Sequence, residues 1–302
     1  MIDQSFLQGW AEFNQKKWNC SADLITLKAP NSDAWCETLI LADRGKLILP
    51  PLNPYHLTVF HPTPTTKVQK TGSQWHEVAK LLAASLQRYK LSSNFYFPPE
   101  IQDIRPFLWQ GFKPEIKYTY YVELPCVSEQ ISSSIRNKIK KANAAGYVSV
   151  RTDDMEAVHR CLAGTETRKG FDHHLTVGDL QLARQLLGED RFRAYVCLTK
   201  DGEPVSASIT MLLSPERALG WISASKTEHL SGGVVQQLQQ FEFEDLHAAG
   251  VRTFDFYGAN LESVSASKAH WGGQLRAFYG IRAPGYKDIV RSGLEWLRFG
   301  NN

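Results

Sequence analysis

Hydrophobic residues recur along the chain with two periods, one typical of helices and one typical of strands. Helical spacing predicts five helices, at 75–89, 132–145, 154–169, 177–187 and 234–249. Runs rich in Val, Ile, Thr, Tyr and Phe predict strands, at 24–27, 38–42, 46–49, 94–97, 117–124, 192–198, 205–213, 219–224, 253–257 and 275–281. This mixture predicts the α/β (α+β) class.

The order of these elements divides the chain into two halves. We predict one domain over 1–115 and a second over 116–302, which is consistent with a length of 302 residues. In the first half, the turn Asp43-Arg44-Gly45 joins two short strands and suggests a hairpin. The second half has the order β-α-α-β-β-β-α-β-(α)-β.

Composition narrows the class of protein. With 43% hydrophobic and 22% charged residues the chain resembles an ordinary globular protein. It has no run of about eighteen apolar residues that would span a membrane. Its first residues lack the pattern of a secretory signal. Five cysteines without paired spacing favour reduced thiols and a cytoplasmic setting, and the net charge of +3 does not by itself imply nucleic acid.

A short glycine segment lies where a helix is predicted to begin. Ser231, Gly232 and Gly233 precede the helix that starts at Val234, directly after a strand. A helix N-terminus exposes unpaired N–H groups with partial positive charge, and glycines allow an anion to approach closely. The alternative is a flexible turn. In the whole strand–loop–helix–strand order, anion binding is favoured.

Three stretches resemble one family. They are SIRNKIKKA at 134–142, FDFYGAN at 254–260 and KAHWGG at 268–273. Together with the element order, they resemble the GNAT acyltransferase superfamily, and more narrowly its Fem-like branch, over about 117–285. The resemblance implies two GNAT-like domains, each a mixed, mostly antiparallel sheet flanked by helices. The first domain is expected to be degenerate and the second to have the complete acyltransferase order.

The resemblance also implies a donor site. In the family, the loop before the third main helix holds the pyrophosphate of acyl-CoA, and two splayed strands admit the pantetheine arm. Carried over, this assigns acyl-CoA binding to Ser231, Gly232, Gly233 and Val234, and we add Lys268, which could hold a phosphate group or the oxyanion. The family's R/Q-x-x-G-x-G/A run is absent as such, so a charged tRNA stays open as an alternative donor.

The helix at 131–145 carries a candidate acceptor site. One face is apolar, and Arg136 and Lys140 follow the edge of that face. The charges could form a solvated surface or a phosphate-binding rim, for which Arg supplies a planar fork and Lys a point charge. We predict substrate binding by Arg136, Asn137 and Lys140, together with Trp271.

Two acidic residues lie near the apolar face of the helix at 234–249. Asp245 falls in the middle of that face and Glu242 near its edge. A buried carboxylate must be paired or it takes up a proton. The favoured interpretation is a structural ion pair to an arginine, and the alternative is a base that faces the acyl channel.

Acyl transfer to an amine requires a neutral amine, oxyanion stabilisation and a proton for the leaving group. Direct attack needs no protein nucleophile, and no spacing supports a Ser-His-Asp triad. Tyr257 and Tyr279 are the candidate proton donors, and Asn260 could orient the acyl carbonyl or the acceptor. Asp255 could act as general base or could cap a turn. We expect no metal, and Asp172-His173-His174 is interpreted as a loop.

Three functions follow from these residues. The first is acyl transfer, by direct attack, from an activated carrier, most simply acyl-CoA, to an amine on a small molecule or cell-envelope precursor. The second is tRNA-dependent aminoacyl transfer onto such a precursor. The third is a binding protein that has kept the fold and lost the chemistry. The sequence leaves the acyl group, the acceptor and the oligomeric state open.

Overall fold

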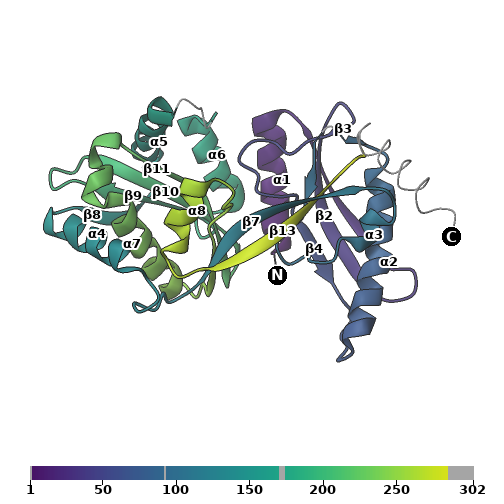
Figure 1. The fold of residues 1–302 in the computed structure, drawn as a ribbon. Coiled ribbons are helices and arrows are strands. Elements are labelled where there is room, and N and C mark those ends of the chain that lie inside the picture. Colours follow the sequence, from purple (N-terminus) through teal and green to yellow (C-terminus); the bar gives the residue numbers. More distant parts are fainter. Residues whose placement is uncertain (1, 92, 170–173, 285–302) are drawn as a thin grey trace, which may run out of the picture. The chain divides into compact units, whose positions relative to one another are not determined.

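The computed structural model describes residues 2–91, 93–169 and 174–284, which form two compact units (Figure 1). Unit 1 comprises Met1–Trp18 and Tyr118–Arg276, and unit 2 comprises Asn19–Lys117 and Ala277–Asn302. The strands β7 (Lys113–Glu123) and β13 (Gln274–Arg282) contribute residues to both. The predicted boundary at 115/116 lies close to the division before Tyr118. The N-terminal segment, however, belongs to unit 1 with the second half of the chain, and the segment from Ala277 belongs to unit 2 with the first half.

Contacts of the first helix explain why the N-terminal segment belongs to unit 1. The sequence pattern predicts no element at α1 (Gln4–Trp18), and the predicted domain limits place it in the first half. In the structure, Trp10 and Phe13 pack edge-on against Trp221, with ring centroids 5.6 and 5.8 Å apart. Burial of these aromatic rings is a large favourable term, so α1 joins unit 1.

Unit 1 is built on a mixed sheet with the strand order β7-β12-β11-β10-β9-β8, in which β7 takes part with its residues from Tyr118 onward. The strands are β8 (Val148–Thr152), β9 (Phe192–Leu198), β10 (Pro204–Ser214), β11 (Arg217–Ser225) and β12 (Thr253–Asp255). Pairings among these strands are antiparallel except between β11 and β12. The predicted mixed, mostly antiparallel sheet is therefore confirmed, with β8 as an unpredicted addition.

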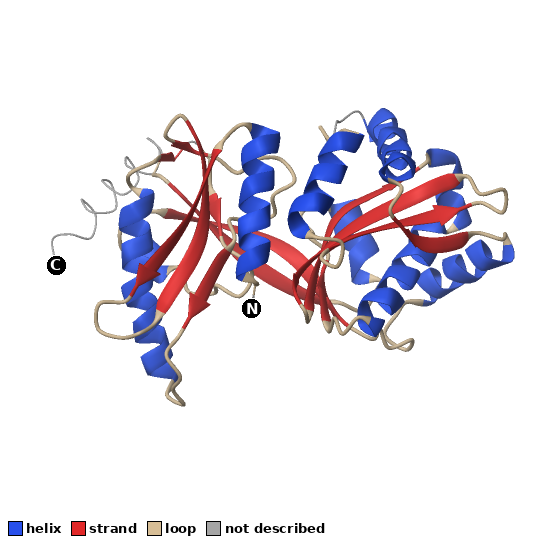
Figure 2. Ribbon diagram, turned by 180° about the vertical axis from the view of Figure 1, so that it is seen from behind, coloured by secondary structure: helices blue, strands red, loops and turns tan. Residues whose placement is uncertain are grey.

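Helices cover both faces of this sheet (Figures 1 and 2). On one side α4 (Ser133–Ala144) packs against α7 (Val234–Ala248). On the other side α5 (Met155–Lys169) contacts β9, β10 and β11, and α6 (Val177–Leu187) contacts α1. The short helices η1 (Thr227–Gly232) and α8 (Glu262–Ala269) precede α7 and follow β12.

The predicted helices of unit 1 form where their apolar faces can be buried. Ile135, Ile139 and Ala142 of α4 are buried, as the helical spacing predicts. The side chain of Ser132 accepts a hydrogen bond from the Ile135 N–H and caps the helix. Gly146, with φ of 79°, follows the C-terminus of α4, where the sequence predicts a stop.

Unit 2 has a second mixed sheet. Its strands are β1 (Ser21–Lys28), β2 (Trp35–Asp43), β3 (Lys46–Leu47) and β5 (Lys90–Leu91), in that order, with β4 (Thr58–His61) also pairing with β2. The predicted hairpin is confirmed, because Ala42 pairs with Leu47 across the turn. β6 (Phe95–Tyr96) pairs with the part of β13 that belongs to this unit. The helices are α2 (Val68–Leu86), which begins before the predicted 75–89, and α3 (Arg105–Leu108).

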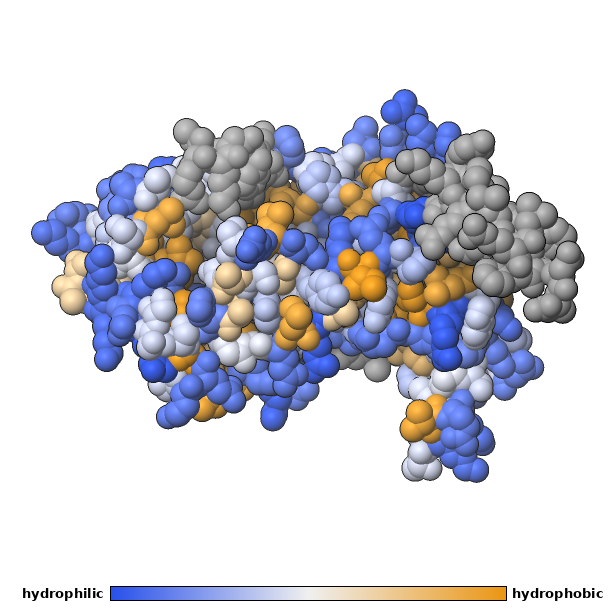
Figure 3. Space-filling view, in the orientation of Figure 1, coloured by the Kyte–Doolittle hydropathy of each residue, from blue (hydrophilic) through white to orange (hydrophobic). Residues whose placement is uncertain are grey.

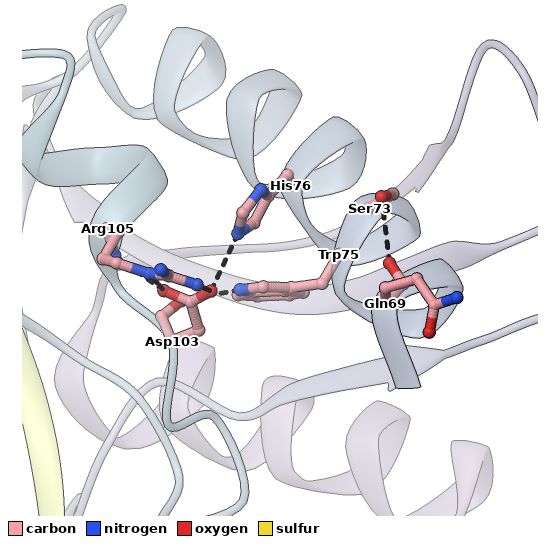
Figure 4. Close-up of polar contacts among 6 residues, drawn as sticks. All are labelled: Gln69, Ser73, Trp75, His76, Asp103 and Arg105. Atoms are coloured by element: carbon pink, nitrogen blue, oxygen red, sulfur yellow. Dashed lines mark hydrogen bonds and ion pairs between the residues drawn. The ribbon is translucent and has the colours of Figure 1, made fainter. Parts of the chain in front are cut away.

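A polar cluster joins α2 to the start of α3 (Figure 4). The Asp103 carboxylate accepts hydrogen bonds from Arg105 Nε and Nη2 at 2.9 and 2.8 Å. It also lies 2.8 Å from His76 Nε2, and its main-chain carbonyl accepts from Trp75 Nε1. The hydrogen bonds from Arg105, followed by the one with His76, hold the pKa of Asp103 well below its usual range. Asp103 is therefore a fixed anion that ties the two elements together.

The surface is mixed in character. On the face shown in Figure 3, hydrophobic residues form small patches among hydrophilic ones. Within the described parts of the chain, no helix is both long and apolar enough to cross a membrane.

Candidate functional site

A cavity lies where two strands of unit 1 separate. β11 and β12 pair in parallel only from Arg217 opposite Thr253 to Leu219 opposite Asp255. β12 then ends, whereas β11 continues to Ser225. The gap contains a cavity of about 430 Å³, which we call the β11–β12 cavity. Its walls come from β10, β11, α7, the segment after β12 and α8, and include Ser208, Trp221, Gln239, Glu242, Tyr257 and Lys268.

The turn after β12 is held by its own polar residues. Asp255 is buried, accepts a hydrogen bond from Thr119 Oγ1 at 2.6 Å, and accepts another from the Tyr257 N–H at 2.8 Å. Thr119 Oγ1 in turn accepts from the Gly258 N–H at 3.0 Å. Of the two roles predicted for Asp255, this geometry supports the capping of a turn.

Tyr257 adopts a backbone conformation that is rare for a tyrosine. Its φ is 55°, in the left-handed region, where a bulky residue is strained by roughly 1 kcal/mol or more. The Asp255 carboxylate and the Thr119 hydroxyl hold this turn and keep the Tyr257 ring among the walls of the β11–β12 cavity. Burial raises the pKa of the Tyr257 phenol, which therefore keeps its proton at neutral pH. A protonated phenol suits the predicted role of proton donor.

Asn260 and Lys268 both hold the turn after β12 through hydrogen bonds. Asn260 Oδ1 accepts from the Tyr118 N–H at 2.9 Å, and its Nδ2 donates to the Tyr118 carbonyl, so that it anchors the segment to β7. Asn260 is exposed and is not among the residues that line the cavity. Lys268 Nζ donates to the carbonyls of Phe256, Tyr257 and Gly258 at 2.6, 3.3 and 2.7 Å.

These contacts explain why a lysine follows the FDFYGAN segment. An ammonium group has three donors, and the carbonyls of residues 256, 257 and 258 accept from Lys268. The arrangement favours a positioning role for Lys268 over direct contact with a phosphate group. The predicted contacts of Lys268 and Asn260 with ligands remain predictions.

Glu242 is the most distinctive group in the cavity. It is 1% exposed, and its carboxyl accepts hydrogen bonds from Ser208 Oγ at 3.1 Å, Gln239 Nε2 at 2.8 Å and Thr210 Oγ1. Burial raises the pKa of Glu242 to about 7, although the hydrogen bonds from Thr210, Ser208 and Gln239 oppose that rise. A carboxyl group that titrates near neutral pH can both accept and release a proton in catalysis.

The structure separates the roles of the two acidic residues on α7. Asp245 forms an ion pair with Arg193 Nη1 at 2.7 Å and accepts from Tyr195 Oη at 2.8 Å, as the structural interpretation predicts. Glu242 is the carboxyl group that lines the cavity. The sequence indicates this role of Glu242 only weakly. The one sign is that its partners Ser208 and Thr210 are polar residues inside the buried strand β10.

The segment predicted to bind a pyrophosphate is packed by the chain itself. Ser231 and Gly232 lie within η1, and the Gly233 N–H donates to the Leu230 carbonyl at 3.4 Å. Gly233 has φ of 84°, and a Cβ atom there would lie 2.3 Å from the Lys138 carbonyl oxygen. The glycine therefore permits α4 to approach the start of α7 at Val234. The Gly233 N–H is thus paired within the chain, and the predicted donor contacts at these residues remain predictions.

Three of the predicted acceptor residues meet at a second cavity of unit 1. Arg136, Lys140 and Trp271 line a space of about 560 Å³ between α4 and α7, which we call the α4–α7 cavity. Asn137 is exposed and does not line it. Trp271 also lines the β11–β12 cavity, so one side chain borders both.

Tyr279, unlike the other predicted catalytic residues, is not part of unit 1. It belongs to unit 2, where its carbonyl accepts from the Phe97 N–H at 2.8 Å and its side chain packs against the unit's hydrophobic core. The structure groups Tyr257 with Glu242, and assigns Tyr279 to a different set of neighbours.

The sequence also draws attention to the segment Asp172-His173-His174 and to the cysteines. Asp172 and His173 lie outside the described residues, and His174 packs edge-on against Trp18. In the described ranges, no group of three or more His, Cys, Asp or Glu residues could hold a metal ion. All five cysteines carry free thiols.

Comparison with known proteins places this fold. Residues 130–263 match the family model described as an acetyltransferase (GNAT) domain. The crystal structure of FemX aligns over 92% of each chain with a TM-score of 0.66 and 14% identity. The C-terminal domain of a putative lysylphosphatidylglycerol synthetase from Agrobacterium fabrum aligns over 96% of each chain, with a TM-score of 0.59 and 10% identity.

A third similar structure is L-PGS from Bacillus licheniformis, with 97% of each chain aligned, a TM-score of 0.57 and 14% identity. At these identities the likeness concerns the fold. No curated protein matches the chain at a significant level. Residues 130–263 thus match a GNAT acetyltransferase domain, and the fold of the chain is similar to that of FemX.

Proposed function

We propose that unit 1 transfers an acyl group from an activated carrier to an amine, with Glu242 as the general base. The observation that carries the proposal is the buried Glu242 carboxyl in the β11–β12 cavity, at the point where the strands diverge. A cavity of about 430 Å³ is of the size that accommodates a small acyl group and its linkage.

Glu242 suits the proton transfer that the reaction needs. Attack of the amine nitrogen on the acyl carbon forms the amide bond and breaks the bond to the carrier oxygen. Glu242 takes the proton from the amine, and the protonated Tyr257 phenol in the same cavity gives a proton to the departing oxygen. The proton held by Glu242 then restores that of Tyr257, so the enzyme returns to its starting state.

We infer that the carrier is an aminoacyl-tRNA rather than a CoA thioester. Gly233 packs against Lys138 of α4 and its N–H donates to the Leu230 carbonyl, so this amide is not free for a pyrophosphate. Next to it α4 presents the exposed Lys138 and Lys141, the second of which donates to the Ser231 carbonyl, and such cations suit the phosphate backbone of RNA. Two of the similar structures carry the name lysylphosphatidylglycerol synthetase or its abbreviation, a name that states an aminoacylated product.

The acceptor is proposed to be an amine on a cell-envelope precursor, and the setting to be the cytoplasm. The likeness to FemX in fold supports the first choice, and the five free thiols agree with the second. The acyl group itself is left to experiment.

The test supplies donors and acceptors together. Total tRNA charged with a mixture of labelled amino acids, or labelled acetyl-CoA, is incubated with the full chain and a fraction of soluble cell-envelope precursors. Esters to tRNA hydrolyse in mild base whereas amides persist, so base-stable label in the acceptor fraction reports transfer.

Each outcome decides a different part of the proposal. Base-stable label from tRNA, absent with Glu242→Gln, is the expected result. Label from acetyl-CoA alone would support acyl transfer and contradict the assignment of aminoacyl-tRNA as the carrier. No label from either donor would contradict catalysis and favour the binding-protein alternative.

A further inference from the structure

The α4–α7 cavity differs in composition from the β11–β12 cavity. Its inner wall is apolar and aromatic, with Phe243, Trp271 and Ile139 buried. The rings of Phe243 and Trp271 pack edge-on, with centroids 5.2 Å apart. A flat apolar body would find aromatic faces and edges to pack against in this space.

The outer rim of the same cavity is positively charged. Arg136 and Lys140 both lie on α4, one turn apart, and both line the cavity. Arg136 Nη1 donates to the carbonyls of Ser128 and Ile131, which fixes the guanidinium at the rim. Lys140 is exposed and makes no hydrogen bond or ion pair to the described residues. Its ammonium is therefore available to a ligand.

The rim carries little opposing charge. Among the described residues that line the cavity, Glu244 alone is an acid, and its Oε1 accepts from Gln240 Nε2 at 2.8 Å. With two cations against one carboxylate, and His247 beside them, the rim favours an anion.

We infer that the α4–α7 cavity is a second ligand site, which binds an organic anion whose phosphate or carboxylate group is carried on a flat apolar body. The anionic group meets Lys140 and Arg136, and the apolar body packs against Phe243 and Trp271. The volume of about 560 Å³ accommodates such a molecule. This inference goes beyond the proposed acyl transfer and stands independently of it, because binding at this site is measured without turnover.

Trp271 links the site to the first cavity. Its side chain is buried and lines both spaces, and Phe243 contacts Phe256, which lines the β11–β12 cavity. A ligand in the α4–α7 cavity therefore touches a wall of the cavity that contains Glu242.

The test uses phenyl phosphate as the probe and the full chain labelled with fluorotryptophan. The chain has eight tryptophans, so Trp271→Phe and Trp221→Phe variants assign the two fluorine signals of interest. We expect phenyl phosphate to shift the Trp271 signal and to leave that of Trp221, in the other cavity, in place. Benzoate distinguishes a carboxylate from a phosphate as the preferred anionic group.

Variants with matched exposure test the role of the rim. Lys140→Gln is expected to raise the dissociation constant of phenyl phosphate about tenfold, the loss of one good charge contact. Lys138→Gln, on the same helix and also exposed but outside the cavity, is expected to change it less than about twofold. Phenol and inorganic phosphate, which each lack half of the ligand, are expected to bind far more weakly.

Three results would overturn the inference. The first is a Trp271 signal that neither phenyl phosphate nor benzoate moves at millimolar concentration. The second is equal weakening by Lys140→Gln and Lys138→Gln, which would indicate general surface charge. The third is binding of inorganic phosphate as tight as that of phenyl phosphate, which would indicate an ion contact without the aromatic wall.

Discussion

Glu242 in unit 1 and Asp103 in unit 2 are both carboxyl groups that accept several hydrogen bonds, but their donors and their contact with water differ. Glu242 is 1% exposed and is surrounded by the neutral donors Ser208, Thr210 and Gln239. The Asp103 side chain is 26% exposed and is held by Arg105 and His76.

The difference shows how environment divides carboxyl groups into two kinds. Burial among neutral donors favours the protonated form, so the pKa of Glu242 rises to about 7. The Arg105 guanidinium favours the charged form, so the pKa of Asp103 falls below its usual range. The first kind can move protons at neutral pH, and the second kind can only hold structure together.

The largest expected effect is on activity. Glu242→Gln keeps the size of the side chain but removes the base, and we expect the transfer rate to fall about 10²- to 10⁴-fold. The rate is measured by the base-stable label from charged tRNA. Asp103→Asn serves as the matched control, because it removes the charge of a carboxyl group in unit 2, and should retain the wild-type rate. Equal losses in both variants would indicate a general structural effect.

The same substitution is expected to raise stability at high pH. Because the folded-state pKa of Glu242 lies above its usual 4.5, its contribution to stability is complete below pH 4.5 and is lost as pH rises through about 7. At about 1.4 kcal/mol per pH unit, this loss is about 3 kcal/mol. In urea unfolding, the free energy of unfolding of Glu242→Gln should therefore increase relative to that of the wild type between pH 5 and pH 8. A gap that does not change with pH would contradict the burial of an ionisable group.

Two tyrosines sharpen the comparison between the units. Tyr257 lines the β11–β12 cavity, whereas Tyr279 belongs to unit 2. Tyr257→Phe removes only the hydroxyl, and we expect a loss of transfer rate of about tenfold if that group protonates the leaving oxygen. Tyr279→Phe should leave the rate within about twofold of the wild type. A larger loss for Tyr279→Phe would return Tyr279 to the catalytic set.

The smallest expected effect concerns Asp103. Its pKa is lowered in the folded state, so its contribution to stability is present above its unfolded value, near pH 4, and is lost as pH falls further. Asp103→Asn is expected to lower the thermal midpoint of unfolding by a few degrees at pH 7 and by less at pH 3. Calorimetry at the two pH values measures the difference. A larger deficit at pH 3 would have the wrong sign for an ion pair.

Most elements of the fold follow from local patterns. The strand at Phe192–Leu198 and the helix at Val177–Leu187 have the predicted bounds, because their apolar periods continue to a clear turn. The helix α1 shows why the domain limits differ: Phe6, Trp10 and Phe13 have helical spacing, but only the fold reveals that Trp221 is their partner.

The site could be predicted in part. FDFYGAN and KAHWGG do lie together, joined by the hydrogen bonds from Lys268 to the carbonyls after β12. The sequence does not distinguish a lysine that binds a ligand from one that binds carbonyls, because both follow a glycine-containing strand end. Nor does the sequence show which of Glu242 and Asp245 lines the cavity, since their partners Ser208 and Arg193 come from the distant strands β10 and β9.

The pH dependence of amine acylation tests the account most directly. With charged tRNA as donor, kcat/KM of the wild type should rise with pH in two parts, one with a midpoint near 7, where Glu242 loses its proton, and one at higher pH, where the acceptor amine loses its own. In Glu242→Gln the part of the rise with a midpoint near 7 should vanish, leaving a low rate that increases only with deprotonation of the acceptor amine. A profile in Glu242→Gln with the same midpoint and height as the wild type would contradict the assignment of Glu242 as the base.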